Sequence, residues 1–143
     1  MTNRTEWPRR ELAAVPPLKI AKELAELVYQ SCDLKNLEIE DALNRIYELG
    51  RFGVSYMDFS DRNSAEALIF PRADEDNRFG ILVDTHNKSE EELNYNTLHE
   101  IGHSFFYHRI GGDMPRRMLK VSDEEEIFCD EFASQLLKLI CKK

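Results

Sequence analysis

The chain has little of what marks disulfide-stapled, secreted or membrane-embedded proteins. It contains only three cysteines, an odd number without a paired spacing, so a disulfide framework is not expected. No apolar run approaches the roughly 18 residues of a membrane span, and the first residues lack the apolar stretch of a signal peptide. These absences predict a cytoplasmic protein that does not enter a membrane.

Positive charge is also scarce. The chain carries 19 Lys and Arg against 27 Asp and Glu, which gives a net charge of -8 and opposes sustained binding to nucleic acid. Arg116, Arg117 and Lys120 form one small basic group late in the chain. We expect it to be a solvated loop, and docking of an acidic partner is the alternative.

The length of 143 residues fits a single domain spanning 1–143. It is too short to hold an enzyme domain and a separate helix-turn-helix unit as well. Residues 1–17 are polar and end at Pro16 and Pro17, so we expect a loosely ordered N-terminal segment there.

The apolar pattern predicts an α+β fold with four to five helices and a small three-stranded sheet, antiparallel or mixed. Two helices are expected near the N-terminus, at 18–31 and 39–49. A helix that begins after Ser89, with a capping-box pattern, is expected to end before Gly111, and a last helix begins after Ser122. The expected strands are 53–59, 65–70 and 79–84, joined by turn-rich runs at 60–64 and 72–77.

The most informative motif is H-E-x-x-H at residues 99–103. On a helix, His99 and His103 lie on one face, about 40° apart, so both imidazoles can bind one metal ion. Glu100 lies about 100° further round. It could therefore take a proton from a water molecule at the metal without being a ligand, as the general base of a zinc hydrolase does.

A third ligand is expected from the last helix, where Glu126 and Asp130 are four residues apart in an E-x-x-x-D pattern. Glu126 could complete the site, and Asp130 could accept a hydrogen bond from a ligand histidine. Two histidines and one carboxylate leave a fourth position for water, which is typical of catalytic zinc sites.

Other polar side chains near these motifs have simpler interpretations. Glu124 and Glu125 are expected to be solvated in the first turn of the helix. Cys129 is expected to be a small core residue, with ligation of the metal as the alternative. We expect His108 to lie at the surface or behind the ligands, and His86 to be solvated.

Together, Thr97-Leu-His-Glu-Ile-Gly-His103 and Glu126-x-x-Cys-Asp-x-Phe-Ala133-x-x-Leu-Leu137 resemble the ImmA/IrrE family of small metallopeptidases. The resemblance implies His99, His103 and Glu126 as metal ligands and Glu100 as the catalytic carboxylate. Cys129 stands where the family usually has alanine. The resemblance also implies a substrate, a separate helix-turn-helix repressor whose cleavage relieves repression in a stress response or a mobile element.

The expected function is therefore zinc-dependent hydrolysis of a peptide bond, with manganese or another divalent ion as an alternative metal. The substrate is expected to lie along an exposed sheet edge, which we assign to residues 79–84. Two other classes stay open: a zinc hydrolase of a non-peptide substrate, and a noncatalytic or toxin-like partner of a repressor.

Overall fold

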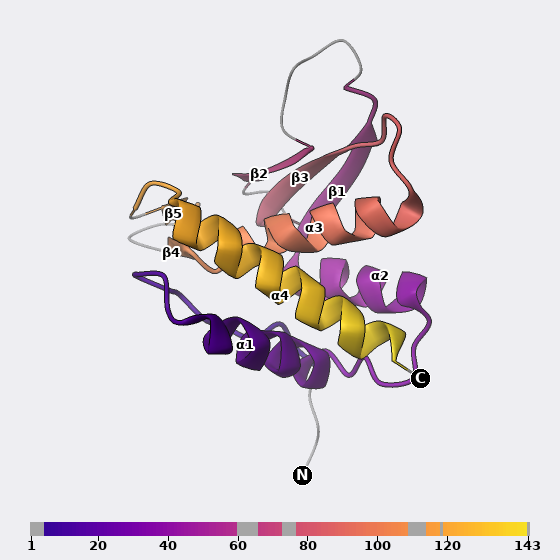
Figure 1. The fold of residues 1–143 in the computed structure, drawn as a ribbon, viewed down its shortest axis with the longest axis horizontal. Helices are drawn as coiled ribbons and strands as arrows, with labels where there is room; N and C mark the ends of the chain where they lie inside the picture. The colour runs from indigo at the N-terminus through magenta and orange to yellow at the C-terminus, as the bar shows by residue number, and fades with distance from the viewer. Residues whose placement is uncertain (1–4, 60–65, 73–76, 109–113, 118, 143) are drawn as a thin grey trace.

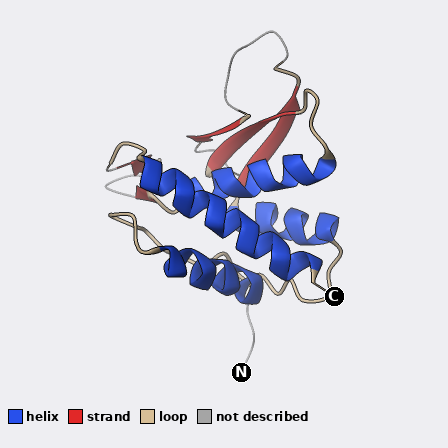
Figure 2. Cartoon of the chain, in the orientation of Figure 1, coloured by secondary structure: helices blue, strands red, loops and turns tan. Residues whose placement is uncertain are grey.

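A computed structural model of the protein describes residues 5–59, 66–72, 77–108, 114–117 and 119–142. Over these residues the chain folds into four helices, a three-stranded sheet and a two-stranded hairpin (Figures 1 and 2). The expected α+β class is confirmed. The predicted turn runs 60–64 and 72–77 fall largely outside the described residues.

The first two helices follow the apolar spacing of the sequence. Helix α1 spans Leu18–Ser31 and buries Ala21, Leu24, Ala25 and Val28 on one face. Helix α2 spans Ile39–Gly50 and ends at Arg51, which adopts the left-handed conformation. Both predicted helices are confirmed, and α1 packs extensively against the last helix of the chain.

The sheet is mixed and has the order β1-β3-β2. Strands β1 (Phe52–Met57) and β3 (Phe79–Asp84) are parallel, and β2 (Ala67–Pro71) pairs antiparallel with β3. The prediction that residues 79–84 form an exposed edge is wrong, because β3 is the central strand. Its buried residues Phe79, Gly80, Ile81 and Val83 fit that central position.

Two long helices carry the motif residues. Helix α3 (Glu90–Ser104) begins with the predicted capping box, in which Ser89 and Glu92 each accept a hydrogen bond from the other's backbone N–H. Helix α4 (Asp123–Cys141) begins after Ser122, whose hydroxyl accepts a hydrogen bond from the backbone N–H of Glu125. In Figure 1, α4 crosses in front of α3, and the sheet lies on the other side of α3.

Helix α3 is shorter than predicted. It ends at Ser104, and Phe105 and Phe106 then enter the core, so the apolar pattern continues after the helix has stopped. Strand β4 (Tyr107–His108) follows and pairs antiparallel with β5 (Arg116–Arg117).

The N-terminal segment from residue 5 has no helix or strand, but it is attached to the core. Trp7 stacks on Phe105 at 5.5 Å between ring centroids and meets Phe52 edge-on. The backbone N–H of Leu12 donates to the carbonyl of Phe105. These contacts attach the described part of the segment to the core. In the described part of the chain, no helix is both long and apolar enough to cross a membrane.

Candidate metal centre

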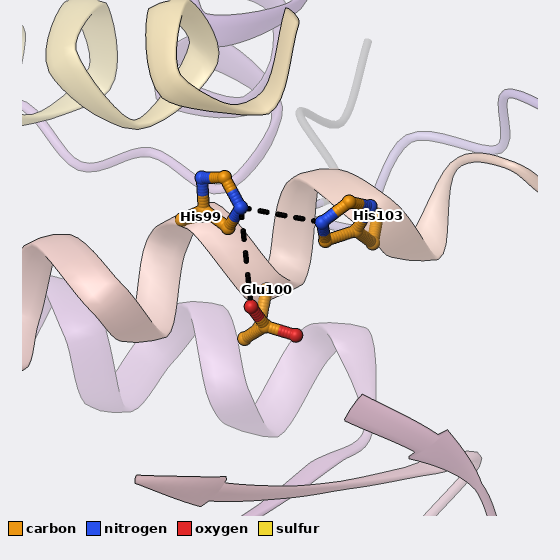
Figure 3. A group of neighbouring side chains, drawn as sticks. All are labelled: His99, Glu100 and His103. Atoms are coloured by element: carbon orange, nitrogen blue, oxygen red, sulfur yellow. Dashed lines mark hydrogen bonds and ion pairs between the residues drawn. The ribbon is translucent and has the colours of Figure 1, made fainter. Parts of the chain in front are cut away.

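His99 and His103 lie one turn apart on α3, with their Nε2 atoms facing each other at 3.2 Å (Figure 3). His103 is buried, and the His99 side chain is 14% exposed. Each ring uses its other nitrogen, Nδ1, to contact a carboxylate on α4. The H-E-x-x-H spacing therefore does bring the two imidazoles together, with both Nε2 atoms directed at the same point.

Glu126 adds a carboxylate oxygen to this point from the first turn of α4. Its Oε1 lies 2.6 Å from His103 Nε2 and 3.6 Å from His99 Nε2. Ligands held at about 2.1 Å from a tetrahedral zinc ion lie roughly 3.4 Å from one another. The two distances at His99, 3.2 and 3.6 Å, are close to this value, whereas the 2.6 Å between His103 Nε2 and Glu126 Oε1 is shorter and would lengthen if an ion bound. The donor set of two imidazoles and one carboxylate thus fits a divalent transition metal.

The two helices approach closely because Gly102 has no side chain. A Cβ atom at this position would lie 3.1 Å from Cys129 Sγ and 3.3 Å from Cys129 Cα. Cys129 is fully buried, as predicted for a small core residue. This close approach sets the distance between α3, which carries the histidines, and α4, which carries Glu126.

Glu100 extends from α3 beside the histidine pair (Figure 3), and its Oε2 lies 4.0 Å from His99 Nε2. Its side chain is 12% exposed. Burial, and then the charge of Glu126, raises the pKa of Glu100 to about 8. A cation bound at the site would oppose this shift by favouring the carboxylate form. Glu100 forms, with His99 and His103, one group of side chains that could hold a metal ion, so by geometry it is itself a possible ligand.

Asp130 lies one turn after Glu126 and accepts from His99, with a distance of 2.8 Å between Asp130 Oδ1 and His99 Nδ1. The same oxygen accepts a hydrogen bond from the hydroxyl of Tyr95 at 2.9 Å. The Asp130 side chain remains 54% exposed. Asp130 is thus within hydrogen-bond distance of a histidine, the arrangement expected of a residue that orients a ligand.

Glu125 corrects a prediction from the sequence. It is not solvated: its side chain is 2% exposed, and its Oε2 lies 2.5 Å from His103 Nδ1. Arg117 pairs with both carboxylate oxygens of Glu125, so it is not simply solvated, whereas Arg116 and Lys120 are exposed as predicted. The apolar stripe of α4 was the missed signal, since Phe128, Cys129 and Phe132 lie three, four and seven residues after Glu125.

A second group that could hold a metal consists of His103, Glu125 and Cys129. Its chemistry suits a cation less well. The guanidinium of Arg117 already binds both oxygens of Glu125. Burial, followed by the nearby carboxylates, raises the pKa of Cys129 well above its usual value, whereas thiolate is the form that binds metals. The site at the two Nε2 atoms is therefore the better candidate.

A cleft of about 250 Å³ opens onto the candidate site between α3, α4 and β2. Two larger hollows lie elsewhere, but among the described residues neither is lined by a histidine. Within the described part of the chain, β2 is paired only on its β3 side, and its first residue, Ala67, lines the cleft. The sheet edge beside the site is therefore β2, not β3.

The remaining histidines lie apart from this cluster. His108 is half-buried in β4, where its Nε2 lies 3.0 Å from the carbonyl oxygen of Leu12. His86 is exposed, as predicted, and its Nδ1 lies 3.3 Å from Asp58.

Comparison with known proteins adds no family assignment: no family model matches the chain, and no curated protein or solved structure is significantly similar to it. The ImmA/IrrE resemblance therefore depends on the two motifs alone. What the structure establishes at this site is a group of histidine and carboxylate side chains that could hold a metal ion.

Proposed function

We propose that the protein is a zinc-dependent peptidase that cuts a protein substrate in the cleft between α3, α4 and β2. The observation that carries the proposal is the pair of imidazole Nε2 atoms, 3.2 Å apart and joined by a Glu126 oxygen. His99, His103 and Glu126 would hold the ion. Zinc in such a site acidifies water and polarises a carbonyl group.

Glu100 would act as the general base. It lies at the cleft, near the histidines but farther from His99 than Glu126 is, and it is largely shielded from solvent. From there it can accept the proton of an attacking water molecule and return it to the amine that leaves. Burial strengthens its affinity for that proton, which suits a base that works near neutral pH.

An extended peptide would be positioned by the outer edge of β2, which no other strand covers in the described part of the chain. Main-chain hydrogen bonds to a sheet edge hold a peptide while making few demands on its sequence. The ImmA/IrrE resemblance supplies the substrate class, a helix-turn-helix repressor. A noncatalytic site is the alternative: in that case Glu100, 4.0 Å from His99, would serve as a fourth ligand that closes the site.

Metal content and cleavage, measured together on three variants, test this function. The wild type should bind about one zinc ion per chain, and His103→Ala should lose most of it because only two protein ligands remain. His86→Ala, which removes an exposed histidine outside the site, is the matched control and should retain the metal.

Glu100→Gln separates catalysis from binding. The amide has almost the same shape but cannot take up the proton, so this variant should keep zinc and lose cleavage. The substrates are unfolded casein and a purified helix-turn-helix repressor, with new peptide ends detected by mass spectrometry. Loss of zinc in Glu100→Gln would favour the closed, noncatalytic site. Equal cleavage by Glu100→Gln and wild type would exclude Glu100 as the base.

A further inference from the structure

Glu125 is the only buried carboxylate among the residues that the structure describes. Burial of a charged carboxylate is unfavourable unless other charges and hydrogen bonds compensate for the lost water. An apolar residue at the same place in a helix would often be at least as stabilising as such a buried ion pair. The position of Glu125 in the core stripe of α4 therefore indicates a role in addition to packing.

Arg117, whose charge compensates that of Glu125, is held in place by several contacts. Arg117 donates from Nη1 to Glu125 Oε2 at 2.9 Å and also pairs through Nη2 with Oε1. Its Nε donates to the carbonyl of Leu119 at 2.9 Å, and its guanidinium lies over the ring of Tyr107 at 5.4 Å. Strand pairing of Arg117 with Tyr107 fixes the backbone. The β4–β5 hairpin thus delivers a rigid guanidinium to Glu125.

This arrangement determines which nitrogen of His103 carries the proton. The arginine fork donates to both oxygens of Glu125, so the carboxylate acts as an acceptor on both. A distance of 2.5 Å from Glu125 Oε2 to His103 Nδ1 is favourable only if Nδ1 is the donor. Nε2, which faces His99 and Glu126, is then the nitrogen left for a metal ion. Without an ion, Glu126 Oε1 at 2.6 Å would accept a hydrogen bond from a proton on Nε2, which the metal would replace.

We propose that Glu125 and Arg117 are positioning residues that hold His103 with its Nε2 lone pair directed at the metal position. The inference depends on the proposed metal site and extends it to an ion pair that neither the motif nor the ligand set includes. Asp130 has the corresponding place beside His99, but it is half-exposed and shared with Tyr95. We therefore expect Glu125 to affect the metal more strongly than Asp130, because water screens its interaction with the histidine less.

Zinc affinity provides the first test, measured by competition with a chromophoric chelator. Glu125→Gln should weaken zinc binding roughly 10- to 100-fold, because the amide leaves His103 without its anionic acceptor. Glu124→Gln is the matched control: it removes the same charge one residue away on an exposed side chain. Equal affinities for these two variants would overturn the proposal.

The tautomer of His103 provides a second readout that requires no metal and no activity. In the metal-free protein labelled with 15N-histidine, His103 Nδ1 should be protonated, and Glu125→Gln should lower the share of molecules with a proton on Nδ1 while Glu124→Gln does not. If Glu125→Gln fails to fold, Arg117→Gln is the second variant, because it weakens the same interaction at a side chain that is less buried than Glu125. An unchanged tautomer in the folded variant would also overturn the proposal.

The two readouts distinguish this inference from the proposed function. If the wild type binds no zinc but Glu125→Gln still shifts the tautomer, the metal site is wrong and the positioning interaction is correct. If zinc binds and all variants have the wild-type tautomer and affinity, the metal site stands and the positioning role of Glu125 is refuted.

Discussion

Gly102 faces Cys129 where α3 and α4 pack together, and replacing it with alanine should push these helices apart. The new Cβ would lie 3.1 Å from Cys129 Sγ, 3.2 Å from its Cβ and 3.3 Å from its Cα. The sulfur can rotate away, but the Cα belongs to the backbone of α4. The helix itself must therefore move by a few tenths of an ångström.

Two opposing effects determine the stability of Gly102→Ala without metal. Overpacking at such a close approach costs about 1–3 kcal/mol. Replacing glycine by alanine inside a helix returns about 1 kcal/mol. The net loss should be small, roughly 0–2 kcal/mol. Zinc affinity should fall more clearly, about tenfold or more, because ligand distances tolerate only about 0.2 Å of displacement and Glu126 moves with α4.

Urea unfolding in EDTA and zinc competition measure these two quantities separately. Cys129→Ala in the Gly102→Ala background removes the sulfur but leaves the new methyl group pressed against the backbone and β-carbon of residue 129, so it should restore the affinity only in part. Cys129→Ala alone is the control for loss of the thiol. The reasoning is refuted if Gly102→Ala is more stable than wild type and binds zinc equally well, since the helices would then have room for the methyl group.

Two further predictions concern metal removal and the thiols. Chelation of zinc should lower the free energy of unfolding by about 2.7 kcal/mol, relative to protein with free zinc at 100 times Kd. Unfolding would be measured in EDTA and in zinc-buffered solution. The two free energies would be equal if the folded state binds no metal. At pH 8, iodoacetamide should modify exposed Cys141 first, because burial raises the pKa of Cys32 to about 12 and keeps its thiol protonated. Mass spectrometry of the native protein measures the two rates, and the prediction is wrong if Cys32 is modified as fast as Cys141.

The sequence predicted the elements whose signals are local. The apolar spacing of 18–31 located α1, and the Ser89 capping box located the start of α3. Residues 79–84 matched β3 because an almost continuous apolar run is typical of a buried strand. In each case the residues that determine the element are neighbours in sequence.

Strand order and the hairpin could not be predicted in this way. The almost continuous apolar run of 79–84 favours a strand buried on both faces, but nothing within these residues identifies β1 and β2 as its neighbours, and the prediction of an edge is wrong. The hairpin pairs Tyr107 with Arg117, and neither of its two-residue strands has a sequence pattern that predicts a strand. Because the buried aromatic residues Phe105 and Phe106 follow directly after α3, the apolar pattern also runs past the end of the helix.

The candidate site shows the same division. The spacing of His99, Glu100 and His103 determines their relative directions on one helix, so a motif was enough to bring them together. Glu125 and Glu126 are adjacent and chemically identical, and only the helical face distinguishes them: the first lies on the core stripe and the second at the cleft. A helical-wheel plot of α4 distinguishes the two, because it places Glu125 on the apolar face and Glu126 outside it.

The charge at the site gives an independent reason to expect a cation there. Glu100, Glu126 and Asp130 all line one small cleft in a chain that is already acidic, and the only guanidinium that the structure shows pairing with α4 at this end is bound to Glu125. Carboxylates in such proximity repel one another, and the charge of Glu126 contributes to the raised pKa of Glu100. A divalent cation at the two Nε2 atoms would turn this repulsion into attraction. A proton could relieve it at only one carboxylate.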